Sequence, residues 1–259
     1  MLLKRCPVCP PQSENSGANM KLTIALAGNP NCGKTTMFNN LTGAHQHVGN
    51  WPGVTVERKS GIVNFDVKGC QKGEVEVIDL PGTYSLSPFS RDEVVAADYL
   101  VDGNPDCILN IVDGTNLNRN LYLTTQLVEL GIPVVIAINM IDVVKKRGDS
   151  INIPKLSAKL GVPVVEVSAI SGEGLRKAIE ECRDAVEHKL LPAKQRIFSD
   201  SVENALANIE KTLPQNIDHI RFLAVKVFER DERIVRFGAS DDARKAAEPQ
   251  IETCEKLFG

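Results

Sequence analysis

Residues 28–35, GNPNCGKT, carry two glycines, a lysine and a threonine at the spacing of a phosphate-binding loop. An apolar run precedes this segment and an amphipathic stretch follows it, so we expect a strand before it and a helix after it. Its backbone N–H groups and the helix N-terminus would face a triphosphate. Lys34 would contact the β and γ phosphates, and the hydroxyl of Thr35 would bind Mg²⁺. The alternative is a glycine turn that carries a surface lysine.

A second polar motif, DLPG at residues 79–82, follows the apolar run 75–78. Asp79 should therefore lie at the carboxyl end of a strand, where α/β sheets bind their ligands. We expect its carboxylate to hold Mg²⁺ through water and the Gly82 N–H to meet the γ-phosphate. A DxxG sequence alone is usually only a turn, and its distance from the phosphate loop is what favours the metal role.

Residues 139–142, NMID, predict which base is bound. The carboxylate of Asp142 can accept hydrogen bonds from N1–H and the exocyclic amine of guanine, whereas adenine offers no matching donor pair. Met140 stands where the usual pattern has lysine, so it can supply only apolar packing against the base. Ser168 and Ala169, after another apolar run, are placed to offer backbone N–H groups to guanine O6. These residues predict a guanine nucleotide.

Apolar runs alternate with amphipathic stretches before residue 190. We predict strands at 22–27, 62–67, 75–80, 107–112, 134–139 and 162–167, and helices at 34–42, 92–101, 117–130, 154–160 and 175–188. This alternation predicts a mainly parallel α/β sheet. A hairpin of residues 54–66 and 73–80 would add one antiparallel strand. The predicted fold class is therefore a Ras-like P-loop α/β fold, followed by a small all-α domain.

Three units are expected along the chain. Residues 1–19 are rich in Pro, Ser, Asn and Gly and predict a flexible N-terminal extension. Residues 20–190 hold the alternating pattern, and residues 191–259 hold helical periodicity at 200–212, 218–227 and 241–258. A unit of roughly 70 residues is marginal alone, so we expect the helical domain to pack on the first domain.

Composition narrows the class of protein. Lysine and arginine total 30 against 33 acidic residues, a net charge of −3, which excludes nucleic-acid binding by bulk charge. The chain has an odd number of cysteines, seven, and five of them are scattered singly rather than spaced as a disulfide framework, which indicates a reducing compartment. No stretch reaches the roughly 18 to 20 apolar residues of a membrane span, and no signal core opens the chain, so we expect neither spanning nor export.

Several motifs together resemble the TRAFAC class of GTPases and, within it, the FeoB family of ferrous iron transport proteins. The resemblance runs from about residue 21 to the chain end, and its most specific segments are 28–31 (GNPN), 48–59 (VGNWPGVTVERK), 79–86 (DLPGTYSL), 118–123 (NRNLYL) and 139–142 (NMID). It implies GTP as substrate and GDP as product. The implied nucleotide contacts are Gly28, Asn29, Pro30, Asn31, Cys32, Gly33, Lys34, Thr35, Thr36, Gly53, Val54, Thr55, Asp79, Gly82, Asn139, Met140, Asp142, Ser168 and Ala169.

The resemblance also assigns the switch. It implies that residues 45–58 form switch I and that Thr55 reaches Mg²⁺ and the γ-phosphate when GTP is bound. Mg²⁺ would thus be held by Thr35, Thr55 and Asp79. Gly49, Pro52 and Gly53 punctuate this polar segment, as a loop that orders around a γ-phosphate requires.

Catalysis should be unusual. Ras-type enzymes orient the attacking water with a glutamine directly after DxxG, but Thr83 stands there, so intrinsic hydrolysis should be slow. Relatives without that glutamine use a monovalent cation together with an asparagine at the position of Asn31, which implies K⁺ stimulation. The implied catalytic set is Lys34, Thr55, Asn31 and Gly82. A turn-forming role for Asn31 is the alternative.

In the family, a helical domain that modulates GDP binding and then a membrane domain follow the GTPase domain. The resemblance implies a cytosolic N-terminal portion at the cytoplasmic face of the inner membrane, partnered by its own or an associated ferrous iron permease domain. No nucleic acid is expected, and a homo-oligomer is possible. The alternatives are a soluble GTPase acting in ribosome or RNA maturation, which would need a basic, aromatic surface that residues 190–259 lack, and a nucleotide-gated binding module.

Weaker signals stay open. Cys6 and Cys9 have the spacing of metal ligands, but the sequence offers no second pair to complete a site. We interpret His45 and His47 as ordinary loop residues rather than iron ligands. Trp51 either packs against the sheet edge or moves with the switch. Further expectations are that Asp113 and Asn116 brace the following helix and that Cys32 faces the phosphates through its backbone.

Overall fold

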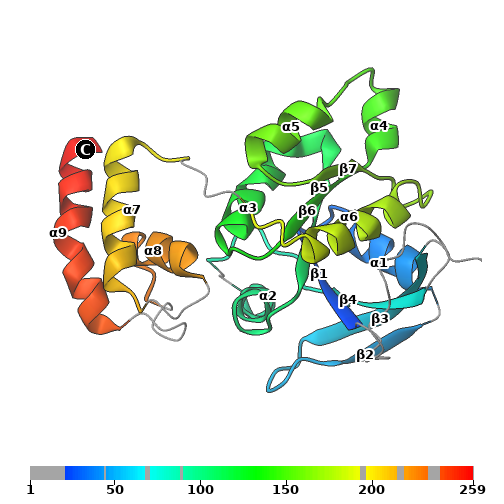
Figure 1. Ribbon diagram of the computed structural model, residues 1–259, viewed down its shortest axis with the longest axis horizontal. Coiled ribbons are helices and arrows are strands. Elements are labelled where there is room, and N and C mark those ends of the chain that lie inside the picture. Colours follow the sequence, from blue (N-terminus) through cyan, green and yellow to red (C-terminus); the bar gives the residue numbers. More distant parts are fainter. Residues whose placement is uncertain are drawn as a thin grey trace, which may run out of the picture.

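The computed structural model describes residues 21–258, except 44, 68–70, 88–89, 193–196, 215–218 and 233–239. Its centre is a seven-stranded sheet in the order β2-β3-β4-β1-β5-β6-β7 (Figure 1). The strands are β1 (Lys21–Gly28), β2 (Gln46–Asn50), β3 (Glu57–Val67), β4 (Gln71–Asp79), β5 (Cys107–Asp113), β6 (Val134–Asn139) and β7 (Val164–Glu166).

The sheet is mainly parallel. Strand β1 pairs in parallel with β4 and β5, and the parallel set continues through β6 to β7. Strand β3 runs antiparallel to both β4 and β2. Every residue of β6 is buried, as in a strand covered on both faces. The predicted Ras-like α/β fold class is confirmed.

Helices cover both faces of the sheet. The elements before residue 190 are α1 (Lys34–Thr42), α2 (Arg91–Asp102), the short 3₁₀ helix η1 (Gly114–Asn116), α3 (Leu117–Glu129), α4 (Ile141–Lys146), α5 (Ile153–Leu160) and α6 (Leu175–Glu187). Apolar side chains of α1 and α6 form one buried cluster with the sheet. Those of α2 and α3 form a second cluster on the other face. The site described below lies at the sheet edge between these layers.

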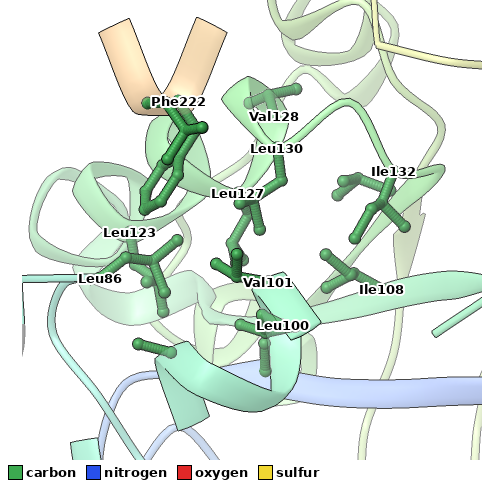
Figure 2. Close-up of a cluster of buried hydrophobic side chains, with 14 of the residues drawn as sticks. Leu86, Leu100, Val101, Ile108, Leu123, Leu127, Val128, Leu130, Ile132 and Phe222 are labelled. Carbon is green, nitrogen blue, oxygen red and sulfur yellow. The ribbon is translucent and has the colours of Figure 1, made fainter. Parts of the chain in front are cut away.

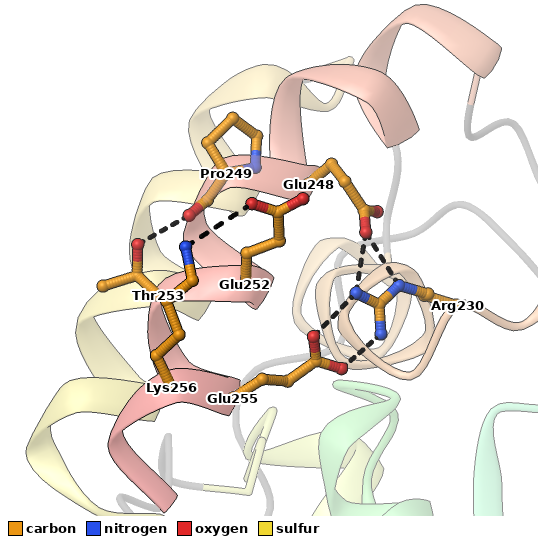
Figure 3. A network of polar contacts seen from close by, with 7 residues as sticks. All are labelled: Arg230, Glu248, Pro249, Glu252, Thr253, Glu255 and Lys256. Atoms are coloured by element: carbon orange, nitrogen blue, oxygen red, sulfur yellow. Dashed lines mark hydrogen bonds and ion pairs between the residues drawn. The ribbon is translucent and has the colours of Figure 1, made fainter. Parts of the chain in front are cut away.

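Three further helices, α7 (Asp200–Thr212), α8 (Ile220–Phe228) and α9 (Asp241–Phe258), pack together beside α3 (Figure 1). Their core is continuous with that of the sheet, because Phe222 of α8 lies against the cluster that contains Leu86, Leu123 and Leu127 (Figure 2). At the end of α8, Arg230 forms ion pairs with Glu248 and Glu255 of α9 (Figure 3). The helical unit is thus joined to the sheet by apolar burial.

Most predicted elements are present, and three helices, α1, α7 and α9, have the predicted bounds. Three short elements were missed, β2, α4 and the three-residue η1. Strand β2 lies within the segment expected to be a switch loop, and its exposed, polar sequence has no apolar alternation to reveal it. Helix α4 has only six residues, too few for a periodic signal. The predicted strand at 54–66 was also wrong at its start, since β3 begins at Glu57.

Candidate nucleotide-binding site

The phosphate loop joins β1 to α1 at the carboxyl edge of the sheet. Gly33 caps α1 with φ 90°, a left-handed conformation that glycine adopts without strain. A Cβ on Gly33 would lie 2.2 Å from Nδ2 of Asn139, so only glycine fits this turn. Asn31 is also left-handed, with φ 65°, as asparagine tolerates. The loop therefore has the compact backbone that the sequence motif predicts.

Helix α1 begins without a side-chain cap. No side chain accepts a hydrogen bond from its first N–H groups, and no acidic residue lies in its first turn. Helix α2 differs, because Ser90 and Glu93 form a complete capping box at its start. Uncapped N–H groups and the helix dipole favour an anion. The start of α1 is thus suited to phosphate.

The predicted phosphate and metal residues meet directly. Nζ of Lys34 donates to Oδ1 of Asp79 at 2.6 Å, and Oγ1 of Thr35 donates to Oδ2 of the same carboxylate at 3.2 Å. Lys34 and Asp79 are each 8% exposed. A buried lysine and a buried carboxylate are tolerated because each neutralises the other. The parallel strands β1 and β4 bring these groups, which are 45 residues apart, to one edge of the sheet.

The DLPG segment packs on the phosphate loop. The N–H of Thr83 donates to the carbonyl oxygen of Gly28 at 3.2 Å. A Cβ on Gly82 would meet Cα of Pro30 at 3.1 Å, so the two backbones approach more closely than a larger residue allows. The hydroxyl of Thr83 donates to the carbonyl oxygen of Ser85 at 2.6 Å. Movement of either segment must therefore disturb the other.

Two cavities open onto these groups. One, of about 390 Å³, lies between the switch I loop and the sheet edge, and it is lined by residues that include Lys34, Thr35, Thr55, Asp79 and Gly82. The other, of about 520 Å³, is lined by Asn29, Pro30, Asn31, Gly33, Lys34, Thr35, Thr36, Gly82 and Met140. The structure thus brings the predicted phosphate and metal residues around shared space.

Gly53 and Val54 lie elsewhere. They line a third cavity, of about 790 Å³, between switch I and α2, together with Thr55. Thr55 is exposed and borders both this cavity and the one that contains Asp79. The segment predicted to be switch I therefore borders the predicted metal residues through Thr55, while Gly53 and Val54 face α2.

On the side predicted to bind the base, Asn139 braces the site. Its Nδ2 donates to the carbonyl oxygen of Cys32, and its Oδ1 accepts from the N–H of Ala169, both at 2.8 Å. The sequence did not reveal this role, because a motif gives a residue's type but not its partner. Met140 has φ 61° and caps α4, whose first turn contains Asp142. Asp142 thus lies beside a rigid bridge between two loops.

The two amides predicted to meet guanine O6 have protein partners. The N–H of Ala169 is bonded to Asn139, as above, and the N–H of Ser168 donates to the carbonyl oxygen of Glu173 at 3.0 Å. Nδ2 of Asn40 also binds the carbonyl oxygen of Ala169 at 2.6 Å. This loop is thus fastened to α1, and its contact with O6 stays a prediction.

Helix α3 adds contacts that the sequence did not assign. Nδ2 of Asn29 donates to the carbonyl oxygen of Arg119 at 3.3 Å. The guanidinium of Arg119 lies 4.4 Å from the ring centroid of Tyr84, in the segment after DLPG. Arg119 belongs to the NRNLYL motif, so the signal was present but its contacts were not readable. This residue links α3 to the phosphate loop and to the DLPG segment.

Trp51 packs instead of lying exposed. It is 7% exposed, and its ring centroid lies 5.0 Å from that of Tyr99 in α2. The guanidinium of Arg58 lies 5.2 Å from the same ring. Of the two roles considered, packing against its neighbours is the one observed.

Cys32 is buried within the phosphate loop, as a residue acting through its backbone would be. Burial is the main cause that raises the pKa of its thiol to about 11, although nearby Lys34 lowers it. The thiol therefore stays protonated and unreactive near neutral pH.

The weaker signals yield no metal site in the described residues. His45 and His47 are exposed, and no group of three or more His, Cys, Asp or Glu side chains is placed to hold a metal there. Cys6 and Cys9 lie outside the described residues. Asp113 caps η1, directly before α3, by accepting from the N–H of Thr115 at 2.8 Å, whereas Asn116 at the start of α3 makes no side-chain cap hydrogen bond. Of the helices described, none has the length and apolar character to span a bilayer.

Comparisons with known proteins place the chain in a family. Residues 22–182 match the family model described as ferrous iron transport protein B, and residues 198–259 match the model of the FeoB cytosolic helical domain. The chain is 45% identical over 226 residues to an Fe(2+) transport protein A/Fe(2+) transporter FeoB fusion protein of Porphyromonas gingivalis, covering 83% of this chain and 26% of the relative. It is 43% identical over 220 residues to the Fe(2+) transporter FeoB of Escherichia coli K12, covering 82% and 27%.

Solved structures of similar chains support the same family. An NFeoB mutant of S. thermophilus bound to mGDP superposes with a TM-score of 0.82 at 44% identity, covering 92% of this chain and 90% of that one. The mGMPPNP-bound NFeoB from S. thermophilus gives 0.78 at 46% identity, covering 91% and 88%. The chain spans about a quarter of the length of the two curated relatives. On its motifs, fold and similarity, the chain belongs to the ferrous iron transport protein B (FeoB) family of GTP-binding proteins.

Proposed function

We propose that this chain binds GTP with Mg²⁺ and hydrolyses it to GDP and phosphate. The observation that carries the proposal is the contact of Lys34 and Thr35 with one carboxylate, Asp79, at the uncapped start of α1. When a triphosphate binds, Lys34 exchanges its partner Asp79 for phosphate oxygens. The S. thermophilus relatives bound to GDP and GMPPNP analogues support this nucleotide class.

The residues fit Mg²⁺. A hydroxyl and a carboxylate lie 3.2 Å apart, and Thr55 borders the same cavity, which gives the oxygen donors that this ion prefers. Thr35, Thr55 and Asp79 would hold it, Asp79 through water. The ion supplies charge stabilisation to the phosphates during transfer.

Guanine selectivity rests on Asp142. Asp142 lies in the first turn of α4, close in sequence to the bridge that Asn139 builds between two loops. Met140, at the preceding cap, borders the cavity of the phosphate loop and offers apolar packing to the base.

Potassium would replace an absent catalytic side chain. The hydroxyl of Thr83 is already bonded to Ser85, so it is not free to orient water as a glutamine would. The carboxamide of Asn31 is exposed on the phosphate loop and lines its cavity, where it fits a ligand for a monovalent cation. We infer slow hydrolysis that K⁺ accelerates.

Through its family, the chain would regulate ferrous iron uptake. We propose a GTPase domain at residues 20–190 and a helical domain at residues 191–259 that relays the nucleotide state to a membrane permease portion, at the cytoplasmic face of the inner membrane. The names of the relatives and the match of residues 198–259 support this assignment.

The test is steady-state GTP hydrolysis at fixed Mg²⁺, with K⁺ and Na⁺ compared at equal ionic strength. Wild type should be faster in K⁺, and Asn31→Ala should lose that difference while keeping its rate in Na⁺. If all four rates agree, the cation role of Asn31 is wrong. If no hydrolysis occurs in either salt, the chain acts as a nucleotide-gated binding module instead.

A further inference from the structure

Lys226 of α8 extends from the helical unit to the segment that follows β4. It is only 3% exposed, and Nζ donates to Oγ of Ser87 at 2.5 Å and to Oε2 of Glu229 at 2.7 Å. Lysine is almost never fully buried unless it is paired. The carboxylate of Glu229 balances the charge of the ammonium, and the hydroxyl of Ser87 is its acceptor in the sheet domain.

Ser87 is the last member of a hydrogen-bonded series that starts at the phosphate loop. The N–H of Thr83 donates to the carbonyl oxygen of Gly28, and its hydroxyl donates to the carbonyl oxygen of Ser85. The hydroxyl of Ser85 donates to the carbonyl oxygen of Ser87 at 3.2 Å and accepts from the N–H of Ser87 at 3.1 Å. Such local bonds fix the backbone of a short segment. Residues 83–87 therefore form an ordered strap between Gly28 and Lys226.

His219, just before α8, and Arg221 within it also make polar contacts with the sheet domain, and they do so at the ends of α2 and α3. His219 contacts the carbonyl oxygens of Leu130 and Val101, close to the ends of α3 and α2. Arg221 donates to Glu129 at the end of α3 at 2.8 Å. Among Lys226, His219 and Arg221, Lys226 is the residue that contacts the strap, which begins beside Gly82.

We propose that Lys226 is a positioning residue for GTP hydrolysis, which holds the strap 83–87, and with it the Gly82 N–H, through Ser87. The inference rests on the proposed GTPase activity and assigns one group of the helical domain to it. Loss of the ammonium leaves the Ser87 hydroxyl without this donor and loosens the end of the strap, while the N–H of Leu86 still donates to Oε1 of Gln126 in α3 at 2.6 Å. GDP has no γ-phosphate for Gly82 to meet, so hydrolysis should suffer more than GDP binding.

The experiment uses the full chain with Lys226→Met, which keeps the apolar stem of the side chain but removes its charge. A hydrogen bond from a charged donor predicts a loss of about tenfold in kcat. The Kd for fluorescent GDP should stay within about twofold, and Lys226→Arg should recover most of the rate. Lys211→Met on α7 is the matched control, because Lys211 is exposed and, among the described residues, its Nζ donates to Asn208 of its own helix.

Ser87→Ala is the second variant, and it also serves if Lys226→Met does not fold. It should give the same fall in kcat, and the double variant should be no worse than either single variant, because one contact is lost in all three. Three results would overturn the inference and leave the proposed GTPase activity standing. These are equal losses in kcat and GDP affinity, fully additive losses in the double variant, and a normal kcat in both single variants. Absence of hydrolysis in wild type would overturn the proposed function as well.

Discussion

The nucleotide site and the junction between α3 and α8 both bury charged side chains, but they do so differently. At the site, Lys34 faces one carboxylate, Asp79, beside a cavity of about 390 Å³. At the junction, Arg221 faces Glu129, Glu203 and Glu210 at 2.8, 3.1 and 3.5 Å, within packed helices. Lys34 can exchange Asp79 for a ligand, whereas Arg221 and its three glutamates stabilise the fold.

This difference separates binding from stability. A ligand that enters the cavity can offer new acceptors to Lys34. The ammonium can therefore bind either Asp79 or the ligand. Arg221 is also 8% exposed, but it lines none of the three cavities described above. Substitutions at the site should therefore change nucleotide affinity, and substitutions at the junction should change the free energy of unfolding.

The largest effect is expected for Arg221→Met. Removing the cation takes the shared ion-pair partner from three neighbouring buried carboxylates, which lowers the free energy of unfolding by about 3 kcal/mol. Urea unfolding followed by circular dichroism measures it. Arg244→Met is the control, since Arg244 pairs at the surface with the exposed Asp241 of its own helix at 3.5 Å, and its loss should cost under about 0.5 kcal/mol. A variant of normal stability with weak GTP binding would break the comparison.

Lys34→Ala should affect ligand binding most. Loss of two charge-assisted contacts predicts about a hundredfold weaker GTP binding and a smaller loss for GDP, since only GTP has the γ-phosphate. Titration with fluorescent GTP and GDP analogues measures both affinities. Lys177→Ala, an exposed change on α6, should leave them unaltered. Equal losses for the two nucleotides would remove Lys34 from the γ-phosphate.

Asp142→Asn sharpens the base side of the site. Replacing an acceptor pair by an amide leaves guanine donors unmatched, so GTP affinity should fall about tenfold while xanthosine triphosphate binds better. Competition between the two nucleotides reports the change, and Asp149→Asn, just beyond α4, is the matched control. Unchanged selectivity would move the base contact away from Asp142.

The two regions also differed in how far the sequence predicted them. Gly33, Lys34, Asp79 and Asp142 lie in local motifs, and parallel strands bring such motifs to one edge, so their convergence followed from spacing. The Lys226–Ser87 contact joins residues 139 apart, and no local pattern specifies it. The bridging role of Asn139 was missed for the same reason. Periodicity predicted long helices such as α7 and α9, but it could not predict the polar edge strand β2.

The smallest effect is a pH dependence at the junction. Burial raises the pKa of Glu129 above its usual 4.5, although Arg221 opposes the shift. The folded protein therefore keeps this proton more tightly than the unfolded chain does. This tighter binding of the proton stabilises the folded state fully below pH 4.5. The stabilisation is lost as the pH rises through the pKa that Glu129 has in the folded protein. The stability of wild type relative to Glu129→Gln should thus decline over that interval, measured by urea unfolding at a series of pH values. A rising difference would mean that Arg221 outweighs burial and that the junction, like the nucleotide site, is governed by its ion pair.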